Sequence, residues 1–130
     1  MIVVHEENAP TMHVPEPCKR TLKVLFSPIL HKECPNIAVG MTILPPGGVS
    51  DEHAHIEGEM FYIVAGNGRI TADGDSITLT PGTAIWSPPG ERHQLINDGS
   101  DTLKILWALN PPGREANILQ NADNSVVEQE

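Results

Sequence analysis

The chain has 130 residues, of which 39% are hydrophobic and 19% are charged, so one domain with a packed core fits its length. Its 8 Lys and Arg against 17 Asp and Glu give a formal net charge of −9, which argues against nucleic acid and anionic membrane surfaces as partners. No stretch approaches the ~20 apolar residues of a membrane span, and the N-terminus lacks the basic start of a secretory signal, so we expect a cytoplasmic protein.

Short apolar segments separated by Gly and Pro run along most of the chain, which holds 11 Gly and 12 Pro. This pattern is typical of many-stranded sandwiches and barrels. The dipeptide Asp73-Gly74 between two such segments predicts a β-hairpin. In chain order, we expect strands at Leu22–Phe26, Ala38–Leu44, Met60–Val64, Arg69–Ala72, Ser76–Leu79, Thr83–Ser87, Gln94–Ile96 and Leu103–Leu109. Eight strands in one domain favour an all-β closed barrel or a two-sheet jelly roll.

The two ends of the chain differ from this middle part. Residues 1–20 are rich in proline and read as an extended N-terminal arm, and residues 21–113 form the predicted barrel. Residues 114–130 form a short C-terminal tail, in which Arg114–Asn121 can make one short helix and residues 122–130 are expected to fray. From this extended arm we expect a homodimer, in which the arm would pair with the partner chain.

Two cysteines, Cys18 and Cys34, are too few for a disulfide framework. One bridge between them is compatible with the sequence, but free thiols in a reducing compartment are the simpler interpretation.

The residues that suggest chemistry lie between positions 47 and 97. His53 and His55 would share one face of a strand, because side chains alternate along it. A straight strand from His53 to Glu59 would span ~20 Å, whereas the ligands of one metal ion lie only ~2 Å from it. A shared ion therefore requires a turn before Glu59, for which Gly58 is suited. A further imidazole, His93, follows a Pro-Gly turn.

Imidazole and carboxylate together are ligands for Mn, Fe, Co, Ni, Cu or Zn. The alternative is that His53 and His55 are exposed polar side chains within the acidic loop 51–57.

The spacing of these residues resembles the two sequence motifs of the cupin superfamily. The run Gly47-(5)-His53-x-His55-(3)-Glu59-(6)-Gly66 resembles the first motif at each defined position. The run Gly82-(5)-Pro88-x-Gly90-(2)-His93-(3)-Asn97 resembles the second. The 15 residues between them are similar to the spacer of small bacterial cupins, and each motif occurs once, as in a single-domain cupin.

The resemblance implies a double-stranded β-helix barrel, that is, a jelly roll, with a metal ion in its mouth. The ligands carried over from the motifs are His53, His55, Glu59 and His93. The implied cofactor is one divalent transition metal per chain, with Fe or Mn favoured and Ni, Zn, Co or Cu as alternatives. Barrel corners and turns are assigned to Gly47, Gly66, Gly82, Pro88 and Gly90, and Asn97 is also taken as structural.

Alternation along the strands predicts which side chains face the inside of the barrel. Phe61 and Ile63 share the face of Glu59, whereas Tyr62 points away. On the last strand the predicted inner face consists of Leu103, Ile105, Trp107 and Leu109. The same reasoning on the other strands predicts a substrate pocket lined by Met41, Phe61, Ile63, Trp86, Leu95 and Trp107. For any single one of these residues plain barrel core is the simpler interpretation, and the neighbours of Met41 are alternatives to it.

Acid and base groups beyond the metal ligands are few, so the catalytic residues stay unassigned. The candidates are His31, Tyr62 and Arg92. His31 lies in a loop that can fold over the mouth, and Arg92 lies in a turn at the mouth, where Glu57 and Glu91 are expected to be solvated surface charges.

Four protein ligands leave two positions open on a six-coordinate metal, which suits a substrate that chelates through oxygen. We expect a metal-dependent enzyme acting on a small oxygenated metabolite. Dioxygenase chemistry comes first because an apolar pocket without an obvious base suits chemistry done by metal and O₂. Isomerase, lyase or decarboxylase chemistry through a metal-stabilised enolate comes second. A non-catalytic sugar- or metabolite-binding module, or a scaffold stapled by metal, is the alternative of another class.

Overall fold

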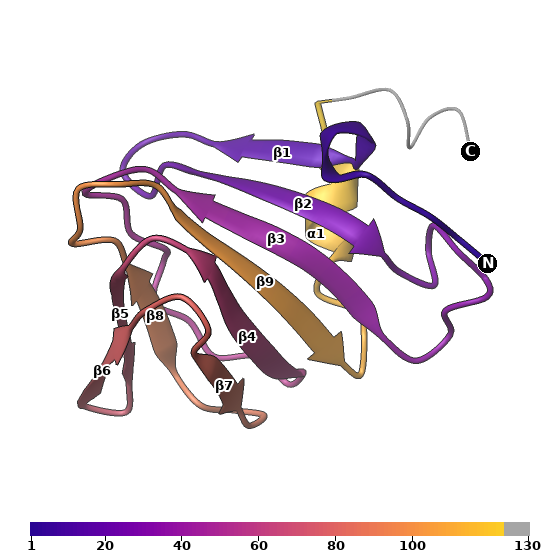
Figure 1. Ribbon diagram of the computed structural model, residues 1–130. Coiled ribbons are helices and arrows are strands. Elements are labelled where there is room, and N and C mark those ends of the chain that lie inside the picture. The colour runs from indigo at the N-terminus through magenta and orange to yellow at the C-terminus, as the bar shows by residue number, and fades with distance from the viewer. Residues whose placement is uncertain (124–130) are drawn as a thin grey trace.

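A computed structural model describes residues 1–123 and shows an all-β protein with one short helix near its C-terminus (Figure 1). The 3-10 helix η1 covers Glu6–Asn8 and the α-helix α1 covers Ala116–Gln120. The strands are β1 Thr11–Val14, β2 Arg20–Phe26, β3 Ala38–Leu44, β4 Gly58–Ala65, β5 Gly68–Ala72, β6 Asp75–Leu79, β7 Ala84–Ser87, β8 His93–Ile96 and β9 Leu103–Asn110.

The strands form two antiparallel sheets, which confirms the predicted double-stranded β-helix. Six strands make one sheet in the order β1-β2-β3-β9-β4-β7, and three make the other in the order β6-β5-β8. In Figure 1 the six-stranded sheet runs across the molecule, and the smaller sheet lies below one end of it. Each of the eight strands expected from the sequence is present.

The core lies on the inner face of the six-stranded sheet. The clearest alternation is in β9, where Leu103, Ile105, Trp107 and Leu109 are buried and the residues between them are less so, as predicted. They join a cluster with Ile63 and with residues of the smaller sheet. Burial of this apolar surface is the main force that holds the two sheets together.

The N-terminal arm contains a strand that the sequence did not indicate. β1 has only four residues between Pro10 and Pro15, and it pairs in antiparallel fashion with β2 of the same chain. It forms one edge of the six-stranded sheet, so pairing of this arm with a second copy stays a prediction. Lys23 and Lys104 both bind Glu6, through its carbonyl oxygen and its carboxylate respectively, and fasten η1 beside the sheet.

The C-terminal segment folds back onto β1 and β2 through α1, which agrees with the helix expected there. Ile118 and Leu119 are its buried side chains. The Glu115 carboxylate, itself buried, accepts hydrogen bonds of 2.6 Å from the Ser27 hydroxyl and from the Gly113 amide. Residues 124–130, the rest of the predicted tail, lie outside the described residues.

Three further expectations concern turns, cysteines and membranes. All four predicted corner glycines, Gly47, Gly66, Gly82 and Gly90, have positive φ values. Cys18 and Cys34 are free thiols. Within residues 1–123, no helix has the length and apolar character needed to cross a bilayer.

Trp107 packs directly over Gly40 of β3, and this contact brings β3 and β9 together at the centre of the sheet. A Cβ atom at Gly40 would lie 2.3 Å from the Trp107 ring and 2.1 Å from the Lys23 carbonyl oxygen. Neither neighbour is the free end of a flexible side chain, so the space cannot be made without moving the sheet.

We expect Gly40→Ala to lower the free energy of unfolding by about 3 kcal/mol or to abolish folding, because it overpacks this contact. Denaturant unfolding measures the change. Gly74→Ala is the comparison, since Gly74 has a φ of 90° but open space around its Cβ position. The Gly74→Ala variant is expected to lose only the free energy of backbone strain, roughly 1 kcal/mol. An equal loss of stability in both variants would contradict the packing argument.

Candidate metal centre

The two motifs meet through a short antiparallel pairing of the segment after β3 with β8. The backbone N–H of His53 donates to the His93 carbonyl at 3.1 Å, and the N–H of His93 donates back to the His53 carbonyl at 2.9 Å. Next to this pairing, the Gly90 amide donates a hydrogen bond to the His55 carbonyl at 2.8 Å. Gly90 has a φ of 83°, a conformation that glycine adopts without strain. Residues 40 positions apart are thus held side by side.

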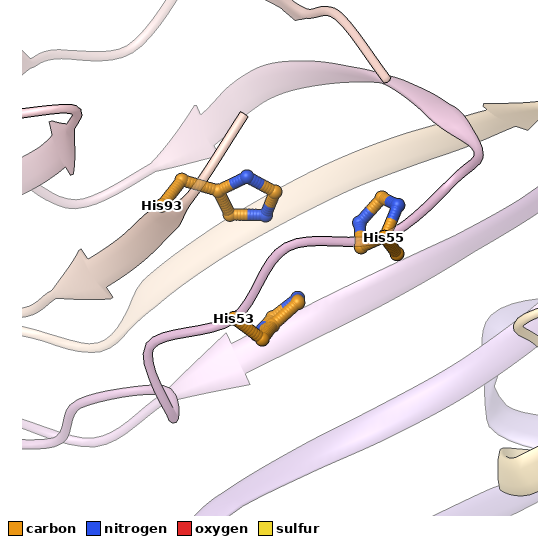
Figure 2. Close-up of side chains that lie close together, drawn as sticks. All are labelled: His53, His55 and His93. Atoms are coloured by element: carbon orange, nitrogen blue, oxygen red, sulfur yellow. The ribbon is translucent and has the colours of Figure 1, made fainter. Parts of the chain in front are cut away.

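The side chains of His53, His55 and His93 turn toward one common space (Figure 2). Their potential ligand nitrogens all lie within 4.8 Å of one another. Glu59 joins them from the start of β4: its Oε1 atom lies 3.0 Å from His55 Nε2 and 3.5 Å from His93 Nε2. The chain bends at residues 56–57, just before Gly58, which provides the turn that the sequence required.

Each imidazole has an acceptor beside its Nδ1 atom. His53 Nδ1 lies 3.0 Å from the Asp51 carbonyl oxygen, and His55 Nδ1 lies 2.8 Å from the Glu57 carbonyl oxygen. A carbonyl can only accept, so both Nδ1 atoms carry hydrogen. His93 Nδ1 lies 3.1 Å from the Ser87 hydroxyl. That hydroxyl already donates to the Glu91 carboxylate at 3.0 Å, so it accepts from His93.

This pattern leaves the three Nε2 atoms with lone pairs directed at each other and at Glu59. Nitrogen lone pairs and a carboxylate at 3.0 and 3.5 Å repel one another unless a cation lies among them, either an added proton or a metal ion. Metal-bound histidines in proteins have this same arrangement, with the second ring nitrogen held by a carbonyl, hydroxyl or carboxylate. The donor set therefore fits a divalent first-row metal.

The protonation of the site agrees with metal binding. Burial raises the pKa of the Glu59 carboxyl, but the hydrogen bonds that His55 and His93 donate when a proton is added at Nε2 outweigh that effect and hold the pKa below its usual value. Burial, and after it the positive charge of Arg114, lowers the pKa of His53. At neutral pH both shifts favour the forms that bind a metal, a carboxylate and a neutral imidazole.

The centre opens into a cavity of about 230 Å³, which the barrel shares with the two ends of the chain. Its apolar walls are Met12, Leu22, Phe61, Leu95, Trp107, Leu109 and Ile118. Its polar lining consists of Arg20, Thr42, Ser50, Asp51, His53, Glu59, His93, Arg114, Glu115 and Asn117.

Three of the six predicted pocket residues line this cavity: Phe61, Leu95 and Trp107. Ile63 faces inward but belongs to the core below the cavity rather than to its walls. Two predicted pocket residues, Met41 and Trp86, do not line the cavity, and the next residue along each strand points inward instead. Met41 lies opposite Lys23 and Leu106 and points away from the cavity, although it is buried, and its neighbour Thr42 lines the cavity.

Trp86 is the second predicted pocket residue that points away from the cavity. In the register of β4 with β7, it pairs with Met60, whereas Ser87 pairs with Glu59. Paired residues on neighbouring strands share a face, so Ser87 points inward and Trp86 points outward. Its side chain is 55% exposed and covers Gly58, where an added Cβ would lie 2.5 Å from the ring.

None of the three catalytic candidates reaches the cavity. Tyr62 points outward, as the alternation of side chains along its strand predicted. His31 lies against Phe26 and lines a second cavity that it shares with residues of the N-terminal arm. Arg92 is exposed and pairs with Glu52 at 2.7 Å, which joins the turn before His93 to the segment that carries His53 and His55.

Glu57, in contrast, is not the solvated charge expected at the mouth. It is 8% exposed, because the chain bend folds its carboxylate back to 3.5 Å from His55 Nδ1.

The sequence reasoning missed the cavity residues supplied by the ends of the chain. Arg20 comes from the first position of β2, two residues before the predicted start of that strand. Period-2 alternation back from Val24 and Leu22 would have placed it on the inner face. Its guanidinium binds Asp51 at 2.9 Å. For Arg114 and Asn117 the local sequence carries no such signal, because α1 is too short for a clear period.

Comparison with known proteins agrees with this geometry. Residues 40–109 match the cupin domain family. An uncharacterized protein of Methanocaldococcus jannaschii is 34% identical over 85 residues, which are 60% of this chain and 68% of that protein. A gentisate 1,2-dioxygenase of Aquipseudomonas alcaligenes is 27% identical over 78 residues. They are 59% of this chain, but the match spans only 22% of the dioxygenase.

The fold has close counterparts among solved structures. A predicted oxalate decarboxylase from Thermotoga maritima superposes with a TM-score of 0.75 at 22% sequence identity, over 85% of this chain and 100% of the other. The family match covers more than half of the chain and contains both histidine motifs. The chain therefore belongs to the cupin family.

Proposed function

We propose that this chain is a metal-dependent enzyme that acts on a small oxygenated metabolite at a 3-His/1-Glu centre. The observation that carries the proposal is the convergence of His53, His55, His93 and Glu59 at the wall of a cavity of about 230 Å³. A first-row metal bound there supplies Lewis-acid and redox chemistry to a ligand in the cavity.

Dioxygenase chemistry is our first choice of reaction. Among the described residues that line the cavity, every carboxylate is already engaged: Asp51 by Arg20, Glu115 by Ser27 and Gly113, and Glu59 by the histidines. That leaves no free carboxylate to move a proton, which favours chemistry that the metal and O₂ perform together. The similarity to a gentisate 1,2-dioxygenase supports the same choice.

The neighbouring residues have supporting roles in this proposal. Phe61 lies edge-on to the His93 ring, with the ring centroids 5.4 Å apart, and keeps it in place. Trp107 and Leu95 make the cavity wall apolar and exclude water from the substrate. Ser87 and Glu91 orient His93 through its Nδ1 atom.

Elemental analysis of untagged protein, purified without chelator under nitrogen, is the first test. We expect about one first-row metal ion per chain, with iron favoured, and O₂ uptake with at least one of gentisate, catechols, β-diketones or thiols. Bound metal without O₂ uptake would contradict the dioxygenase assignment and favour enolate chemistry. No metal after reconstitution would contradict the enzyme proposal and leave a barrel that only binds.

Removal of a ligand is expected to release the metal. We predict that His53→Ala and Glu59→Gln lose most of the bound metal and, with it, the rise in melting temperature that the metal gives the wild type. Metal content and thermal unfolding measure both effects. His13→Ala is the matched control, because His13 lies on β1 and its ring contacts Thr21 and Asp123 at the surface. Full metal content in the first two variants would overturn the ligand assignment.

The Ser87 hydroxyl is expected to tune metal affinity without touching the metal. Ser87→Ala removes the acceptor of the His93 Nδ1 hydrogen, and we expect the metal to bind about 10- to 100-fold more weakly. Competition with a chromogenic chelator measures this affinity. Ser76→Ala is the control, since that hydroxyl is exposed and contacts only Arg69. Unchanged affinity in Ser87→Ala would show that Ser87 does not orient the ligand.

A further inference from the structure

Arg114 is a cation at the rim of the metal cavity whose guanidinium has no partner among residues 1–123. It lies between β9 and α1, is exposed, and contributes to the cavity lining. The other three arginines of the chain each pair with a carboxylate: Arg20 with Asp51, Arg69 with Asp98 and Arg92 with Glu52. In a chain with a net charge of −9, an arginine that stays unpaired beside a cavity is placed to meet a ligand.

The charges around the cavity do not neutralise Arg114. Its side chain lines the same cavity as the candidate ligands His53, Glu59 and His93. The carboxylates of Asp51, Glu59 and Glu115 are held by other groups, as described above. Three neutral imidazoles and one carboxylate around a divalent ion leave about one positive charge. The centre and Arg114 together then leave a positive charge for the ligand to balance.

The cavity is small, and seven of its lining residues are apolar. Leu22, Phe61, Leu95, Trp107 and Ile118 form walls that have no polar group for a ligand, apart from the Trp107 indole N–H. At about 230 Å³, the cavity lies below the usual range of about 300–1,000 Å³ for drug-sized ligands. A small molecule with an apolar body and one anionic end matches these walls and this rim.

We propose that the substrate is a small carboxylate with an apolar body, and that Arg114 binds its carboxylate while its oxygenated end is held at the metal centre. This inference rests on the proposed function of the same site. A guanidinium presents paired N–H donors that match the two oxygens of a carboxylate. Arg20 also lines the cavity, but two of its donors are used by Asp51 and the Cys18 carbonyl.

Two catechols that differ only at the proposed anionic end make the probe: 3,4-dihydroxybenzoate and 4-methylcatechol. Calorimetric titration of the protein with its metal, under nitrogen to prevent turnover, measures both dissociation constants. We expect the carboxylate to bind the wild type about 10-fold or more tightly than its methyl analogue, the usual value of a charged hydrogen bond.

Variants locate the source of this preference. Arg114→Gln is expected to bring the ratio of the two constants close to one, with little change for 4-methylcatechol, and Arg114→Lys to restore part of it. Arg69→Gln, which removes an arginine that pairs with Asp98 outside the cavity, should leave the ratio unchanged. A ratio that Arg114→Gln does not change, or a wild type that binds neither catechol, would overturn the proposal.

The carboxylate site can be tested even if the proposed function fails. If the wild type holds no metal, the same comparison is made on that protein with benzoate and benzamide, which differ in charge but need no metal. A preference for benzoate that Arg114→Gln removes would keep the carboxylate site while the enzyme proposal falls. The absence of such a preference would overturn the carboxylate site as well.

Discussion

The reciprocal hydrogen bonds between the backbones of His53 and His93 are the contact on which the metal centre depends. They join a segment without regular structure to the first residue of β8 and set two imidazoles side by side. The Gly90 amide, which donates to the His55 carbonyl, adds a further hydrogen bond between the same two segments. Because the ligands come from two distant parts of the chain, their geometry is only as rigid as this pairing and the sheets that flank it.

The polar surroundings of the ligands turn this geometry into a chemical site. Hydrogen bonds at all three Nδ1 atoms direct the Nε2 lone pairs inward, and Glu59 completes an arrangement that is stable only around a cation. The walls of the cavity have a different origin. Arg20 and Arg114 come from the two ends of the chain, which close over the barrel and bring positive charge to an otherwise acidic protein.

Much of the barrel could be read from the residues in order, because alternation and Gly-Pro punctuation are local signals. They located eight strands, the inward face of β9 and the outward position of Tyr62. Alternation failed in β3 and β7 because the polar residues Thr42 and Ser87 take the inward face there, so the apolar Met41 and Trp86 were placed on the wrong side. β1 escaped notice because four residues between prolines are too few for a period.

By itself, the sequence determined the strand order along the chain and the turns that need glycine, because these follow from residue type and short spacing, and its resemblance to the cupin motifs indicated the four candidate ligands. Only the tertiary structure decided which face each apolar residue takes, which groups hold the imidazoles and which charges surround the cavity. These depend on strand register and on contacts between distant segments, and a shift of one residue reverses every side chain of a strand. Arg114 is the clearest case, since only the return of α1 onto β1 and β2 brings it to the metal centre.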